Sequence, residues 1–277
     1  GNRMKATIWT RPFYYVIAFL FASISLYPII LMVLSSFKPS AEIFMNPLSW
    51  PEQFSLDTYR TLLERIPFMT YFYNSVFTSV VSVLLIVITT SLAAFYIARY
   101  TFWWNNLLFF FFLMGMMIPI KLGIVPLFLL MKDLGLTNSL WSLIFMYTAQ
   151  GIPLSILILT GFFRTMPIEL EEAARIDGAS DLRILWNVLL PIMRPALATV
   201  IIINFIQAWN DFFFPLIFIS DEMKKTIPVG MLSLFGEYSA DWGSLFAGLT
   251  LSSLPMIVLF FIASKQFMEG MTAGAVK

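Results

Sequence analysis

Long apolar stretches alternate with short polar ones along the whole chain of 277 residues. A helix needs about 20 predominantly apolar residues to cross the hydrocarbon core of a bilayer. Six stretches reach that length, at residues 13–37, 71–98, 107–131, 139–163, 196–219 and 244–264. The pattern predicts an all-α integral membrane protein with six transmembrane helices, organised as a single membrane domain over residues 1–277.

The first stretch follows three basic residues, so a secretory signal peptide is the alternative interpretation. Its length of about 25 residues and the absence of a small-residue cleavage site favour a retained helix. With the N-terminus inside, ten of the 17 Lys and Arg residues lie on the inner side and six on the outer, while Lys121 falls within a span. By the positive-inside rule this distribution predicts cytoplasmic N- and C-termini.

The composition argues against several classes of function. The chain is 59% hydrophobic and 12% charged, with a formal net charge of +1, so charge gives no reason to expect a nucleic-acid partner. Cys and His are both absent. This excludes disulfides, thiolate chemistry, His-based metal sites and His general-base catalysis. We predict neither an enzyme nor a metal site.

The most polar interruption, residues 164–195, separates the fourth and fifth spans. Four of the 16 acidic residues lie between Glu169 and Asp177. Pro167 suits the first turn of a short helix, and Gly178 suits the left-handed position after its last turn. Ser180 can cap a second short helix, which would end at Pro191.

The first of these helices has a face that suits a protein partner. Small alanine side chains allow close approach, and carboxylates accept Arg or Lys donors. The candidate docking residues are Glu171, Glu172, Ala173, Ala174, Asp177 and Gly178. A solvated loop that only connects two spans is the alternative, and from these residues alone both interpretations remain open.

The spacing within this loop resembles a known motif. Glu172-Ala173-Ala174, three residues, Gly178, nine residues, Val188, one residue and Leu190-Pro191 match the coupling-loop motif of ABC importer permeases. The motif commonly has isoleucine where this chain has Val188. Shorter matches extend the resemblance to the carbohydrate-uptake branch, the maltose-type permeases: Asn74-Ser75, Pro126-Leu127, Trp209-Asn210-Asp211 and the tail 266–277.

The resemblance implies a type I permease in a bacterial inner (plasma) membrane, as half of a heterodimer with a second, homologous permease. Two ATP-binding subunits would bind ATP and Mg²⁺, because this chain has no Gly-x-x-x-x-Gly-Lys-Ser/Thr loop. An extracytoplasmic binding protein would deliver a sugar or oligosaccharide, and the outer loop at 220–243 would meet it. A permease for an osmolyte or amino acid is the near alternative. A stand-alone secondary transporter is the more distant one, and it would not need the coupling motif.

Polar side chains within spans are costly and usually face the protein interior or a water-filled path. The fifth span carries four of them, Asn204, Gln207, Asn210 and Asp211, with Trp209 as a stacking surface. They are candidates for the substrate pathway, although amides also join helices inside membranes. Lys121 in the third span is a further candidate. It could contact an anionic sugar, pair with Asp211, or extend toward the membrane surface.

Overall fold

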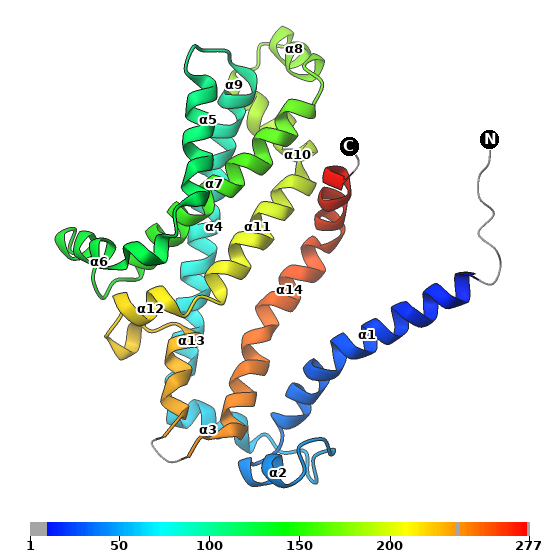
Figure 1. The fold of residues 1–277 in the computed structure, drawn as a ribbon, viewed down its shortest axis with the longest axis vertical. Coiled ribbons are helices and arrows are strands. Elements are labelled where there is room, and N and C mark those ends of the chain that lie inside the picture. The colour runs from blue at the N-terminus through cyan, green and yellow to red at the C-terminus, as the bar shows by residue number, and fades with distance from the viewer. Residues whose placement is uncertain (1–9, 237–238, 276–277) are drawn as a thin grey trace. The chain divides into compact units, whose positions relative to one another are not determined.

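The computed structural model describes residues 10–236 and 239–275, which are predominantly helical (Figure 1). Among the basic residues counted above for orientation, Arg3, Lys5 and Lys277 lie outside the described residues, as do residues 237–238 of the outer loop predicted at 220–243. The helices up to the polar loop are α1 (Thr10–Ser35), α2 (Ser40–Met45), α3 (Asp57–Arg65), α4 (Phe68–Arg99), α5 (Asn105–Met114), η1 (Gly115–Met117), η2 (Ile120–Gly123), α6 (Ile124–Asp133) and α7 (Leu140–Thr165). From the polar loop onward they are α8 (Glu169–Ile176), α9 (Asp181–Ile184), η3 (Leu185–Leu189), α10 (Leu190–Ile192), α11 (Arg194–Trp209), α12 (Phe213–Phe218), η4 (Glu222–Lys224), α13 (Ile227–Gly230), η5 (Met231–Leu234) and α14 (Trp242–Ala275).

The chain divides into two compact units. The first comprises the described residues of Gly1–Phe68 and Met231–Ser253, and the second comprises those of Met69–Gly230 and Leu254–Lys277. The second unit contains the polar loop and the candidate pathway residues, so it holds both candidate sites.

The predicted all-α membrane fold is confirmed, with four helices that could span a membrane in the described residues, or up to six when bent pairs are counted. Within the described residues, α1, α4, α7 and α14 are each long and apolar enough to cross a membrane. Two pairs of bent helices bring the total to as many as six. Long runs of apolar residues identify these helices because lipid offers no partner for backbone polar groups, and a helix satisfies them internally.

The third span is broken, which the sequence pattern did not predict. The segments Asn105–Met117 and Ile120–Asp133 meet at an angle of 78°. Pro119 explains the break, because proline has no amide hydrogen and disfavours a helical conformation in the residue before it. Ile118 accordingly has extended backbone angles, φ −81° and ψ 117°.

The fifth span also differs from the continuous helix predicted over 196–219. The helix α11 ends at Trp209, and α12 begins at Phe213. Asp211 lies in the gap, where its Oδ2 accepts a hydrogen bond from the amide of Phe214 at 3.1 Å. The carboxylate therefore satisfies a free amide at the start of α12, as capping residues do. At its other end, α11 meets the preceding segment Asp181–Ile192 at 84°.

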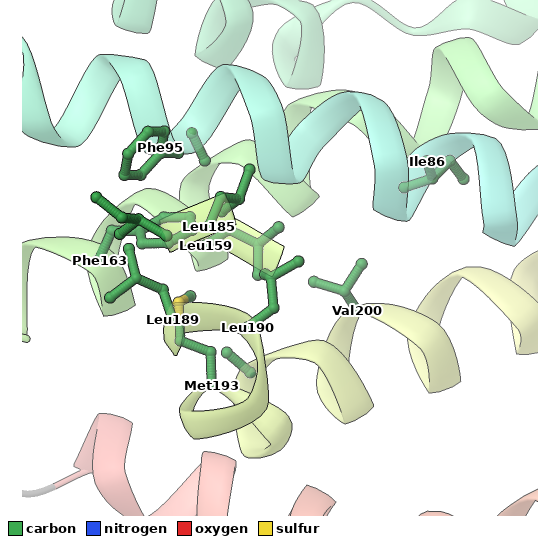
Figure 2. Close-up of a cluster of buried hydrophobic side chains, with 12 residues drawn as sticks. Ile86, Phe95, Leu159, Phe163, Leu185, Leu189, Leu190, Met193 and Val200 are labelled. Carbon is green, nitrogen blue, oxygen red and sulfur yellow. The ribbon is translucent and has the colours of Figure 1, made fainter. Parts of the chain in front are cut away.

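One apolar cluster of the second unit lies where the ends of α4 and α7 meet the start of α11 (Figure 2). Phe95 of α4 and Phe163 of α7 lie in it, with ring centroids 5.8 Å apart. Leu185 and Leu189, from the polar loop between α7 and α11, are completely buried in the same cluster. The loop is thus part of the core of this unit.

In the first unit, polar contacts join the connections that follow α1 and precede α14. Lys38 is completely buried, and its Nζ donates to the carbonyl of Asn46 at 3.1 Å. Asp241 accepts hydrogen bonds from Ser244 and from Arg65, the latter at 2.8 Å. Burial opposes ionisation of Asp241, but these donors outweigh it and lower the pKa of the carboxyl from its ordinary value.

Close packing in the second unit predicts that alanine substitution at two glycines of α7, Gly151 and Gly161, changes the stability of the protein in opposite directions. A Cβ atom on Gly151 would lie 2.2 Å from Oδ1 of Asn204 and 2.5 Å from Cδ1 of Ile86, whereas one on Gly161 would meet nothing within 4 Å. We expect Gly151→Ala to destabilise the protein by about 1–3 kcal/mol, as overpacking does. Gly161→Ala is the matched control and should stabilise the helix by roughly 0.5–1 kcal/mol. Thermal unfolding of the purified protein in detergent measures both, and equal midpoints would contradict this packing.

Candidate functional site

The helix α8 begins the polar loop and ends as its sequence predicts. Three glutamates lie in its first turn, where the helix dipole favours negative charge. At its end, the amides of Gly178 and Ala179 donate to the carbonyls of Arg175 and Ala174, at 2.9 Å and 3.0 Å. This pair of bonds is a Schellman motif, which needs a left-handed residue at Gly178. The φ of +80° at Gly178 confirms the predicted helix stop.

The second helix of the loop begins as predicted and ends differently. Ser180 caps it by accepting a hydrogen bond from the amide of Arg183 at 3.4 Å. Pro191 does not terminate it, because the helix continues to Ile192 through a π-helical turn at Leu185–Leu189. The π-helical turn lies immediately before Leu190-Pro191. Proline has no amide hydrogen, so Pro191 cannot donate the backbone hydrogen bond of a regular α-helical turn.

The candidate docking residues of α8 do not all face the same way. Glu172, Ala173, Asp177 and Gly178 are exposed. Ala174 is partly buried and packs against the apolar cluster. One side of α8 is therefore exposed and carries carboxylates. It also carries the apolar side chain of Ile176, which is 87% exposed.

Glu171 differs from the expectation that it would face a partner. Its side chain is 1% exposed, and its Oε1 lies 2.5 Å from Nε of Arg99, whose side chain is 9% exposed. Burial of an unpaired carboxylate would be very costly, and the guanidinium compensates for it. Glu171 therefore fixes α8 to the end of α4, and its carboxylate points into the unit.

A second group of polar contacts lies beside this ion pair. The hydroxyl of Tyr100 donates to Oδ2 of Asp181, and Nη2 of Arg175 donates to Oδ1 of the same carboxylate at 3.1 Å. Burial, together with the hydrogen bond to Asp181 and its charge, raises the pKa of Tyr100 to about 12. A phenol is already neutral at physiological pH, and the raised pKa keeps the Tyr100 hydroxyl a donor to Asp181 in more alkaline solution as well.

Sequence reasoning assigned no role to Arg99 and Tyr100 beyond counting Arg99 among the inner basic residues. Their partners are 72 and 81 positions away in the chain. Local spacing carries no signal for contacts over such separations. The only clue is that two polar residues occur immediately after a long apolar helix.

The candidate pathway residues of α11 also separate into different environments. Asn204 is 6% exposed, and its Nδ2 donates to Oγ of Ser155 in α7 at 3.0 Å and to the carbonyl of Val200 at 2.8 Å. It therefore joins two helices. Gln207 and Asn210 are exposed. The four candidates of the fifth span therefore do not share one environment: Asn204 is used between helices, whereas Gln207 and Asn210 are open to the surroundings.

The remaining candidates lie where the two broken helices meet. Asp211 accepts a hydrogen bond from the hydroxyl of Tyr147 at 3.1 Å, in addition to the amide that it caps. Lys121 is exposed and does not pair with Asp211; its Nζ lies 5.2 Å from the ring centroid of Phe213, a cation–π contact. Trp209 is 5% exposed and stacks on Phe205, so it does not offer the free stacking surface that the sequence suggested.

Comparison with known proteins agrees with the fold and the loop. Residues 86–272 match the family described as "Binding-protein-dependent transport system inner membrane component". The chain is 33% identical over 276 residues to the inner membrane ABC transporter permease protein YcjP of Escherichia coli (strain K12), covering 99% of this chain and 98% of that protein. It is 32% identical over 256 residues to the multiple sugar-binding transport system permease protein MsmG of Streptococcus mutans serotype c, covering 91% and 92%.

A solved structure has the same fold. One chain of a bacterial ABC transporter involved in the import of the acidic polysaccharide alginate superposes with a TM-score of 0.81 at 24% sequence identity, covering 96% of this chain and 99% of that chain. The fold and the loop therefore define a multi-pass helical membrane subunit of the type I importer class. The chain belongs to the family of binding-protein-dependent transport system inner membrane components, and the resemblance drawn from the coupling motif is confirmed.

The Schellman motif gives a testable consequence at Gly178. A Cβ there would meet nothing within 4 Å, so the only penalty of substitution is the left-handed backbone. We expect Gly178→Val to destabilise the helix end at Gly178 by about 1–2 kcal/mol. The amide of Ala179 should then exchange with solvent about tenfold faster, since about 1.4 kcal/mol corresponds to a factor of ten. Gly178→Asn is the control because asparagine tolerates this conformation better. Equal exchange of Ala179 in both variants would argue against the motif.

Proposed function

We propose that the chain is the membrane-spanning permease subunit of a binding-protein-dependent ABC importer for a sugar or oligosaccharide. The observation that carries this proposal is the structure of the polar loop. One side of α8 is exposed, and on the other side Glu171 pairs with Arg99 at the end of α4, which in turn donates to Met166 after α7. Such a loop can receive movement from a partner and pass it to the spans. Substrate moves by alternating access, driven by ATP hydrolysis in separate subunits.

The exposed side of α8 is the docking surface for an ATP-binding subunit in this proposal. Glu172 and Asp177 would accept Arg or Lys donors, and Ile176 would enter an apolar groove of the partner. Ala173 and Gly178 would permit close approach, and Glu171 would support the surface from within. Each complex would contain two ATP-binding subunits, which bind ATP and Mg²⁺, and a second homologous permease.

The polar loop and both termini would face the cytoplasm, and the binding protein would meet the outer loop predicted at residues 220–243 on the opposite side of the membrane. The basic residues at the ends of α4 and α7, Arg99 and Arg164, support this orientation through the positive-inside rule.

Sugar as the cargo is supported by a relative of the chain and by its polar residues. MsmG is a multiple sugar-binding transport system permease protein. Gln207, Asn210 and Lys121 are exposed although they lie in or next to predicted spans, and such groups need water or a polar partner. Amides both donate to and accept from sugar hydroxyls. We assign these three residues to the pathway, with Asp211 positioning the break between α11 and α12 and Asn204 joining α11 to α7.

The test is ATP hydrolysis by the reconstituted complex, with binding protein loaded from a panel of neutral and acidic oligosaccharides, osmolytes and amino acids. Stimulation of ATP hydrolysis by an oligosaccharide supports the proposal. Stimulation by only an osmolyte or an amino acid would contradict sugar as the cargo and identify that solute instead. If acidic sugars stimulate, Lys121→Met should reduce that stimulation about tenfold, because hydrogen bonds to charged groups contribute about 1.5–3 kcal/mol. Neutral sugars serve as the internal control, and an equal response to both classes would remove Lys121 from the pathway.

Charge reversal tests the docking surface. We expect Glu172→Lys to reduce co-purification of the ATP-binding subunits about tenfold or more, because like charges across an interface cost several kcal/mol. Glu64→Lys is the control: it reverses an exposed carboxylate on α3, whose pairing with Arg60 contributes little to stability. Quantified subunit ratios after affinity purification give the result. Equal ratios in the two variants would exclude Glu172 from the interface.

A further inference from the structure

We propose that Arg99 and Tyr100, the last residue of α4 and the one after it, form the joint through which movement of α8 reaches the transmembrane helices. Both act as positioning residues. The proposal rests on the function proposed above and specifies which contacts of this chain carry the coupling.

Arg99 connects three elements with one side chain. It extends from the end of α4, and its Nε lies 2.5 Å from Glu171 of α8. Its Nη2 donates to the carbonyl of Met166, the residue after α7, at 3.1 Å. Because the guanidinium is planar and rigid, these contacts fix the ends of α4 and α7 relative to α8.

Tyr100 continues the same connection to the second helix of the loop. Its hydroxyl donates to Asp181 at the start of α9. Arg175 of α8 donates to both of these partners, to the Tyr100 hydroxyl at 3.3 Å and to Asp181 at 3.1 Å. Two consecutive residues thus hold both helices of the loop.

The two helices of the loop are held by different kinds of contact. The helix that follows Ser180 contributes completely buried apolar residues to the core, among them Ile184 and Leu185. The helix α8 contributes mainly Ala174, which is only partly buried, and the carboxylate of Glu171. Attachment of α8 to α4 therefore depends on the ion pair more than on apolar area.

The Arg99–Glu171 ion pair suits this task because both of its side chains are buried. Separating Glu171 from Arg99 would leave two buried charges unpaired, and α8 contributes little apolar area that could hold it in place instead. The pair resists both push and pull on α8. A partner that moves α8 must therefore move the end of α4 with it.

The absence of cysteine from the chain permits a direct test. Spin labels on Leu170→Cys of α8 and Ile88→Cys of α4 report the distance between these helices in the complex with its ATP-binding subunits. Spectra are compared without nucleotide and after trapping with ATP, Mg²⁺ and orthovanadate. We expect the same narrow distance distribution in both states for the otherwise unchanged chain. In Glu171→Gln, trapping should shift the distribution or broaden it by about twofold, since the buried Arg99 has lost its partner charge.

Rescue separates positioning from a general loss of structure. Glu171→Asp keeps a carboxylate opposite Arg99 and leaves the bond from Arg99 to Met166 intact, so it should retain the narrow distribution. Exchange of the exposed pair, Arg60→Glu with Glu64→Arg, should leave the distribution unchanged. If Glu171→Gln does not assemble, Tyr100→Phe gives the same test, because it removes only the hydroxyl and should also broaden the distribution.

The outcomes distinguish the joint from the function. A distance that shifts with trapping in the unchanged chain overturns the joint, and so does a Glu171→Gln distribution identical to that of the unchanged chain. Both results leave the importer assignment standing if the complex hydrolyses ATP. If no ATP-binding subunit accompanies the unchanged chain, the proposed function fails and the joint fails with it.

Discussion

Burial of the polar loop's second helix between the ends of α4 and α7 is the constraint on which the rest of the candidate site depends. Leu185 and Leu189 have no exposed surface, and each such side chain stabilises the folded state by about 1.5–3 kcal/mol. The same packing excludes water beside Arg99 and Glu171. An exposed ion pair contributes little, but this one lies where leaving either charge unpaired would be very costly. The apolar core thereby makes the polar contact effective.

The two broken helices obey a related constraint. Within a bilayer, backbone that leaves the helical conformation must find its hydrogen-bond partners in the protein or in a water-filled cavity. At one break Pro119 has no amide hydrogen to satisfy, and at the other Asp211 accepts from the amide of Phe214. These local solutions let the chain bend. They also bring Lys121 and Phe213, from separate segments, into contact.

The sequence predicts the features that local patterns determine. Apolar length identifies the spans, and single residues with special backbone preferences, Gly178 and Ser180, mark where the loop helices end and begin. The π-helical turn and the breaks depend on how a proline or a carboxylate is accommodated by its surroundings, which periodicity does not report. Glu171 was assigned to a partner because it neighbours Glu172 in a polar stretch. Its true environment is set by Arg99, far away in sequence.

In a membrane subunit, whether an exposed residue indicates a binding partner depends on its polarity. Much of α1 is exposed, yet an apolar helix in lipid needs no protein cover, because lipid tails are as apolar as its side chains. Exposure of α1 therefore says nothing about a partner. Gln207 and Lys121 are different, because lipid cannot satisfy their polar groups. Asn204, which has the same chemistry, is satisfied within the chain. Gln207 and Lys121 are thus the exposed residues whose polar groups call for water, substrate or another subunit, whereas the exposed amide of Asn210 donates to the carbonyl of Ile206.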